Sequence, residues 1–287
     1  MMKRYLITAL LALAAGAASY SYYTHYQQNP WTRDGQVRAD VVQITPRVTG
    51  DIVEIYVKDN QRVAKGDTLF VVDPKPYQVA LLQAQATEEQ AHAQFSKAKK
   101  ELERAIGLES RSPGAVPMSA LDNYNTALES AAANVSLAQA QVAQAKLNLS
   151  YTQVVAPTDG FITNLRHHLG AHVVANSPVV ALIDEHSFWI EGFFKETDVA
   201  EVNPQQAARV VLLSQQNLVL EGVVESIGYG ISKTDGSTGN ALLPNVNPNF
   251  QWIRLAQRIP VKVKLNSIPD ELQLRVGATA SVQIHKS

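Results

Sequence analysis

The sequence predicts an elongated α+β protein in which a split β-sandwich is interrupted by a long helical hairpin and followed by a small β-barrel. Residues 44–74 and 154–184 match at a constant offset of 110 positions, and neither half has enough apolar positions to bury a face alone. The residues between them are rich in helix formers. The two halves must therefore meet in one sandwich, and the intervening segment must leave it and return as an antiparallel hairpin.

The composition excludes several functional classes. The chain has 25 basic and 26 acidic residues, so its charge balance does not indicate an interface for nucleic acid or for anionic lipid. It has no cysteine, which excludes disulfides, thiolate metal sites and a lipid-modified N-terminal cysteine. Any attachment to a membrane must therefore come from the chain itself.

Residues 1–25 predict a cytoplasmic start and a transmembrane anchor. Lys3 and Arg4 precede residues 5–23, which carry no charge and are about long enough to cross a bilayer as one helix. A cleaved signal peptide is the alternative, because residues 15–17 are small and follow a short apolar run. Both interpretations place the body of the protein on the non-cytoplasmic side of the inner membrane.

Residues 36–74 and 151–185 are the expected halves of the sandwich, each made of short strands around tight turns. Five positions show the match most clearly: Gly50 with Gly160, Ile52 with Ile162, Ile55 with Leu165, Val63 with Val173, and Leu69 with Val179.

Residues 75–150 predict two helices with a seven-residue apolar repeat. The first helix has two seam rows: Tyr77, Ala84, Ala91, Ala98 and Ala105 in one, and Leu81, Glu88, Phe95 and Leu102 in the other. The second helix also has two: Leu121, Leu128, Val135, Val142 and Leu149 in one, and Tyr124, Ala131, Ala138 and Ala145 in the other. This 3.5-residue repeat predicts a coiled-coil hairpin in which alanine allows close approach.

The ends of the helices have their own signals. Pro74 and Pro76 suit a helix entry, Gly107 follows the last periodic residues of the first helix, and residues 119–122 resemble a capping box that opens the second. The tip then spans roughly residues 107–118. About 30 residues per helix give an arm on the order of 45 Å long.

Residues 186–287 predict a small antiparallel β-barrel. The expected strands are 188–195, 209–213, 219–227, 259–265 and 279–284, with one helical turn at 196–202 and a long loop at 232–249.

These features resemble the membrane fusion proteins of the HlyD type, the periplasmic adaptors of Gram-negative efflux and secretion systems. The resemblance covers an N-terminal anchor, the lipoyl-like halves VRADVVQITPRVTGDIVEIYVKDNQRVAKGDTLFVVDPKPYQ and APTDGFITNL, the hairpin between them, and a barrel that ends in RVGATASVQI. Within the family, ESIGYGI followed by WIRLAQRIPVKVKL is similar to adaptors of the EmrA and aromatic-acid-exporter type.

The resemblance implies a non-enzymatic subunit of a tripartite efflux pump in the envelope of a Gram-negative bacterium. Its partners would be an inner-membrane permease, a TolC-like outer-membrane channel and further copies of the chain, as a trimer or hexamer. Small, aromatic or drug-like compounds would be the cargo. An adaptor of an ABC-driven peptide or protein exporter stays as the alternative, and a structural coiled-coil protein of the envelope is the alternative from another class.

The resemblance also implies residues that dock the channel at the hairpin tip. Family tips carry an arginine, a leucine four residues on, and a serine beyond the turn. Arg104 and Leu108 fit the first two positions, whereas Pro117 stands where the serine is expected, with Ser112 or Ser119 as substitutes.

In the barrel domain, Trp252, Arg254 and Arg258 are candidate contacts to the permease, with a structural role at the barrel edge as the alternative. No catalytic residue or nucleotide site is expected, because neither a phosphate-binding loop nor a nucleophile elbow occurs.

Two features could suggest a cofactor or a metal site. Lipoyl carriers attach a cofactor to a lysine between the halves, but Lys75 precedes the long insert, which favours a lysine at a helix entry. His167, His168 and His172 lack a carboxylate or cysteine at ligand spacing, and adjacent histidines on a strand point to opposite faces. We therefore expect no cofactor and no metal ion.

Overall fold

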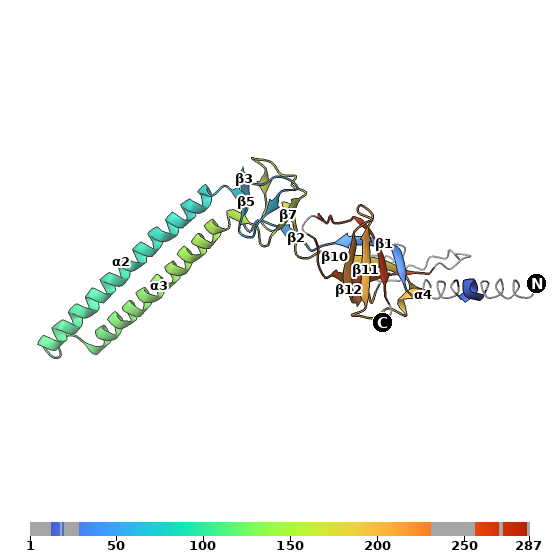
Figure 1. Cartoon of the computed structure of the whole chain (residues 1–287). Helices are drawn as coiled ribbons and strands as arrows, with labels where there is room; N and C mark the ends of the chain where they lie inside the picture. Colours follow the sequence, from blue (N-terminus) through green and yellow to red (C-terminus); the bar gives the residue numbers. More distant parts are fainter. Residues whose placement is uncertain (1–12, 18, 20–28, 231–255, 270–271, 286–287) are drawn as a thin grey trace, which may run out of the picture. The chain divides into compact units, whose positions relative to one another are not determined.

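The computed structural model describes residues 13–17, 19, 29–230, 256–269 and 272–285, which divide into two compact units (Figure 1). One unit comprises residues 1–40 and 185–287, and the other comprises residues 41–184. Within the described ranges, no helix is both long and apolar enough to cross a membrane. Most of the expected anchor at residues 5–23 lies outside the described residues.

Residues 41–184, all of them described, contain two four-stranded antiparallel sheets with the orders β2-β9-β7-β4 and β6-β5-β3-β8. The strands before the hairpin are β2 (Val41–Ile44), β3 (Gly50–Ile55), β4 (Arg62–Val63) and β5 (Thr68–Val72). Those after it are β6 (Gln153–Val155), β7 (Gly160–Thr163), β8 (His172–Val173) and β9 (Val180–Asp184).

Both sheets mix strands from the two halves. β2 pairs with β9, β4 with β7, β3 with β8 and β5 with β6. A shift of 110 residues places β2, β9, β7 and β4 at the positions of β6, β5, β3 and β8, respectively. The two sheets therefore have equivalent strands in the same order. The prediction that the halves complete each other is confirmed, and the sandwich has approximate internal twofold symmetry.

The matched residues form the centre of the sandwich core. Ile52, Ile162, Leu69, Val63 and Val173 are all buried. This core is continuous across both halves, which explains why neither half is expected to fold alone.

The hairpin consists of α2 (Lys75–Arg111) and α3 (Met118–Ser150), which run side by side in opposite directions (Figure 1). Its most buried residues all belong to the predicted seam rows: Ala91, Leu102 and Ala105 on α2, and Ala131, Ala138 and Val142 on α3. At 1.5 Å rise per residue, α2 is about 55 Å long. The heptad interpretation is therefore confirmed, and the arm is somewhat longer than expected.

The ends of the hairpin differ in part from the prediction. Pro74 is the N-cap of α2 and Pro76 lies in its first turn, as expected. However, α2 continues through Gly107 to Arg111, because one glycine costs a helix interior only about 1 kcal/mol. The capping box is also wrong: the N-cap of α3 is Pro117, without a side-chain cap, and residues 119–122 lie inside the helix. The connection, here called the tip loop, is residues 112–117.

In the described part of the chain, six antiparallel strands form a closed barrel in the order β1-β10-β13-β12-β11-β14. These are β1 (Trp31–Arg38), β10 (Trp189–Lys195), β11 (Ala207–Leu212), β12 (Val219–Ile227), β13 (Arg258–Leu265) and β14 (Thr279–Ile284). The short helix α4 (Glu196–Val199) follows β10. Residues 231–255, which include the whole of the expected loop at 232–249, lie outside the described residues.

The sequence prediction missed β1 and placed residues 36–38 in the sandwich. β1 pairs with β10 on one side and with β14 on the other, and it therefore closes what would otherwise be an open five-stranded sheet. Gly35 allows this closure, because a Cβ there would lie 2.7 Å from the carbonyl oxygen of Ala280.

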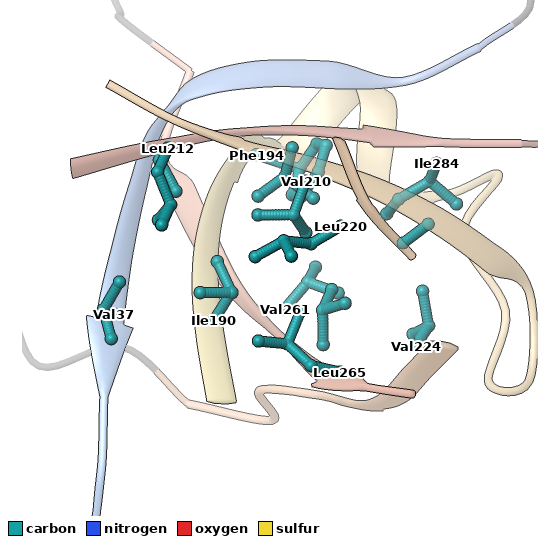
Figure 2. Close-up of a cluster of buried hydrophobic side chains, with 14 of the residues drawn as sticks. Val37, Ile190, Phe194, Val210, Leu212, Leu220, Val224, Val261, Leu265 and Ile284 are labelled. Carbon is teal, nitrogen blue, oxygen red and sulfur yellow. The ribbon is translucent and has the colours of Figure 1, made fainter. Parts of the chain in front are cut away.

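The barrel interior is filled by apolar side chains from all six strands (Figure 2). Val37 of β1 lies in the same cluster as Ile190, Phe194, Val261 and Ile284. The barrel therefore has a packed core instead of an open channel.

Candidate functional site

The hairpin tip presents the residues predicted to dock a channel. Arg104 and Leu108 lie in the last two turns of α2, four residues apart and therefore on one face, and both are exposed. Leu108 is 51% exposed. The tip therefore offers a cation and an apolar side chain together.

Two further apolar residues are exposed at the tip, and the sequence prediction did not include them. Ile106 is 52% exposed and Met118 is 77% exposed. Both lie off the seam rows, and this was the available signal: an apolar side chain outside the seam cannot pack against the partner helix. Neighbouring exposed apolar residues are typical of interaction surfaces.

The third docking position has no matching serine in the structure. Pro117 occupies it and serves as the N-cap of α3. Ser112, at the start of the tip loop, and Ser119, in the first turn of α3, are both exposed, and the backbone N–H of Ser112 donates to the carbonyl oxygen of Leu108 at 2.9 Å.

Glu109 is the titratable residue that the tip perturbs most clearly. Its Oε1 accepts from the N–H of Gly114 at 2.7 Å and its Oε2 accepts from the N–H of Val116 at 2.9 Å. These hydrogen bonds favour the charged form, so the N–H groups of Gly114 and Val116 hold the pKa of the Glu109 carboxyl below its usual range. The carboxylate is therefore ionised at neutral pH.

Of the three residues proposed for the permease, the structure describes only Arg258. Trp252 and Arg254 lie outside the described residues. Arg258 begins β13, and its guanidinium forms a charge-assisted hydrogen bond with the carboxylate of Asp34 on β1. It lines a surface groove of about 480 Å³ together with Trp31, Arg33 and Lys195.

A second groove, of about 420 Å³, lies on the outer face of β1, β14 and β11. Trp31, Arg33 and Arg209 line it, and the Arg33 guanidinium lies 5.4 Å from the centre of the Trp31 ring. Sequence reasoning missed Trp31 and Arg33 because β1 was not predicted. Its inward residues Thr32, Gly35 and Val37 are small or only weakly apolar, so the alternation is hard to see.

Among the residues considered for cofactors and metals, Lys75 begins helix α2, and the imidazoles of His167 and His172 have partners within the chain. Lys75 is the first residue of α2, and its backbone N–H donates to Asp73 at 3.1 Å. His167 Nδ1 lies 3.2 Å from the carbonyl oxygen of Val179, whereas His172 Nδ1 lies 2.7 Å from Asp51 Oδ1 on the neighbouring strand. The His172–Asp51 pair was not predicted, since only strand pairing brings the two together.

Two family models match this chain, one over the sandwich with its hairpin and one over the barrel. Residues 40–185 match the model for the barrel-sandwich hybrid domain of RND membrane fusion proteins, and residues 187–285 match the model for an AAEA-like β-barrel domain. The protein YdhJ of Escherichia coli K12 is 38% identical over 281 residues, which cover 98% of this chain and 97% of YdhJ.

Two solved structures share the fold at low sequence identity. The membrane fusion protein Spr0693 of Streptococcus pneumoniae R6 superimposes with a TM-score of 0.65 at 15% identity, over 90% of this chain and 99% of that one. MacA of Actinobacillus actinomycetemcomitans superimposes with a TM-score of 0.62 at 20% identity, over 90% of this chain and 79% of that one.

Proposed function

Because the chain belongs to the RND-type membrane fusion protein family, we propose that it is the periplasmic adaptor subunit of a tripartite efflux pump. It links an inner-membrane permease to a TolC-like outer-membrane channel. The observation that carries this proposal is the hairpin: two helices of 37 and 33 residues leave the sandwich and end in a tip with exposed apolar side chains. Such an arm adds little to its own domain's core, which favours a role in reaching a partner.

The adaptor acts as a physical linker and not as an enzyme. Energy for transport comes from the permease. One hairpin cannot enclose a path for cargo, so several copies assemble side by side, as a trimer or hexamer. Residues 5–23 anchor the chain in the inner membrane, and the sandwich, hairpin and barrel lie in the periplasm of a Gram-negative bacterium.

The docking residues extend the same proposal. Arg104 and Leu108 contact the outer-membrane channel, and Trp252, Arg254 and Arg258 contribute to the permease contact. Arg258 also has a structural role, because its ion pair with Asp34 joins β13 to β1 on the outside of the barrel.

The cargo is a small, aromatic or drug-like compound. The motifs ESIGYGI and WIRLAQRIPVKVKL resemble those of HlyD-type adaptors of the EmrA and aromatic-acid-exporter group, which includes the multidrug adaptor MdtN. The match of residues 187–285 to the AAEA-like barrel supports this group.

Crosslinking in intact cells tests the docking function. The chain has no cysteine, so Leu108→Cys creates a single thiol at the tip, and Gln90→Cys provides a matched exposed thiol in the middle of α2. We expect an adduct with an outer-membrane channel protein from position 108 and none from position 90. Good expression without any adduct at position 108 would contradict channel docking and favour a structural envelope protein.

A further inference from the structure

The seam of the coiled coil ends on a carboxylate. Leu81, Glu88, Phe95 and Leu102 form one seam row of α2, and the next position in this row is Glu109, in the last turn of the helix. Its carboxylate bonds the tip loop instead of packing against an apolar partner. A charged residue at a seam position is costly for packing, so its role has to be sought in the loop.

The tip loop has four backbone N–H groups, because Pro113 and Pro117 have none. Two of them are satisfied by backbone: Ser112 donates to the carbonyl of Leu108, and Ala115 donates to the carbonyl of Ser112. The remaining two, from Gly114 and Val116, both donate to Glu109. One carboxylate thus completes the hydrogen bonding of the loop.

The other devices that commonly fix such a loop are missing here. The N-cap of α3 is a proline without a side-chain cap. Within the described part of the chain, no side chain other than that of Glu109 forms a hydrogen bond with the backbone of residues 112–117. Gly114 adopts a φ of 86°, a conformation that glycine also leaves easily, so the loop depends on this carboxylate for a single shape.

We propose that Glu109 is a positioning residue for channel docking: its carboxylate holds the tip loop in one conformation and so presents Leu108 and Met118, on either side of the loop, as one docking surface. The inference rests on the proposed function, because it assumes that the tip meets a partner. It assigns to Glu109 a role through the loop and not a contact with the channel.

Hydrogen exchange on the purified full-length chain tests the contact itself. Glu109→Gln keeps the side-chain length but replaces one acceptor oxygen by an NH₂ group, which faces a backbone donor. Exchange of the peptide that covers residues 112–117 should become faster by on the order of tenfold, because a hydrogen bond to a charged group is lost. Glu103→Gln is the control, since Glu103 is exposed on the same helix and undergoes the same change in charge. Equal exchange in both variants would overturn the proposal.

Crosslinking then tests the consequence for docking. In the Leu108→Cys background, Glu109→Gln should reduce the channel adduct several-fold while helix content stays unchanged, and Glu103→Gln should leave the adduct as it was. An undiminished adduct despite faster loop exchange would show that docking does not need the ordered loop. If the Leu108→Cys variant without a second substitution formed no adduct, the docking function itself would be contradicted. The exchange experiment would still decide whether Glu109 holds the loop.

Discussion

Gly50 and Gly160 occupy equivalent positions in the two halves of the sandwich, and close packing explains both. A Cβ at Gly160 would lie 2.0 Å from the carbonyl oxygen of Ile183, and one at Gly50 would lie 2.8 Å from Cγ1 of Val72. Neither position has a positive φ, so neither glycine is required by turn geometry. The repeat thus marks two positions where a side chain would collide with the neighbouring strand.

The stability of the tip loop should depend on pH through Glu109. The pKa of Glu109 is lowered in the folded chain, so its stabilising effect is complete above the unfolded value of about 4.3 and is lost as pH falls through the folded value. The ratio of loop exchange rates between Glu109→Gln and the parent should therefore be large and constant near neutral pH. It should approach one under acid conditions below the folded pKa. A ratio that does not change with pH would contradict a role for the carboxylate.

At the scale of elements, small seam residues set the distance between α2 and α3. Ala138 is only 1% exposed, and Ala91, Ala105 and Ala131 are buried as well. A seam of alanine buries little apolar area per residue, but it allows the two helices to lie close together. Close packing of α2 against α3 therefore requires small side chains at these seam positions.

Replacing Ala138 by leucine should separate the helices. We expect Ala138→Leu to destabilise the hairpin by about 1–3 kcal/mol, since overpacking forces the backbones apart. Ala140→Leu introduces the same side chain at an exposed position two residues later and should change stability by less than about 0.5 kcal/mol. Thermal unfolding followed by helical circular dichroism would measure both, and equal effects would refute the close-packed seam.

At the scale of the whole molecule, the chain begins its barrel before it builds the sandwich. β1 precedes residues 41–184, and the other five strands of the described barrel follow them. Trp31 pairs with Gln283, and the N–H of Ile284 donates to the carbonyl of Pro30, so the start of β1 lies beside the end of β14. The barrel is complete only when both ends of the chain contribute.

A circular permutant tests this dependence. Residues 185–285 alone should not unfold cooperatively, because β10 and β14 would be left as open edges. Joining residues 29–40 behind residue 285 through a short glycine–serine linker should restore a cooperative transition. Gly35→Val in the permutant is the control, since its side chain would meet the carbonyl oxygen of Ala280. Cooperative unfolding of residues 185–285 alone would show that β1 is dispensable.

Features that repeat along the chain could be predicted from the amino-acid sequence. The offset of 110 predicted a shared sandwich, and the heptads predicted which helix positions are buried, because periodicity alone states which side chains share a face. Arg104 and Leu108 as docking residues came from family resemblance and stay a proposal. The helix ends were less accurate, since Gly107 and residues 119–122 gave only weak local signals that the packing of α2 on α3 overrode.

The places where distant segments meet could not be predicted from local sequence patterns. β1 has a weak alternation of its own and is fixed by its pairing with β10 and β14. In the sequence, Glu109 is a charged residue at a seam position, and its role emerges only because the tip loop turns two N–H groups toward it. Local sequence patterns specify which face of a helix or strand is buried. Closure of a barrel and hydrogen bonding of a loop's backbone depend on contacts between distant residues, which no local pattern encodes.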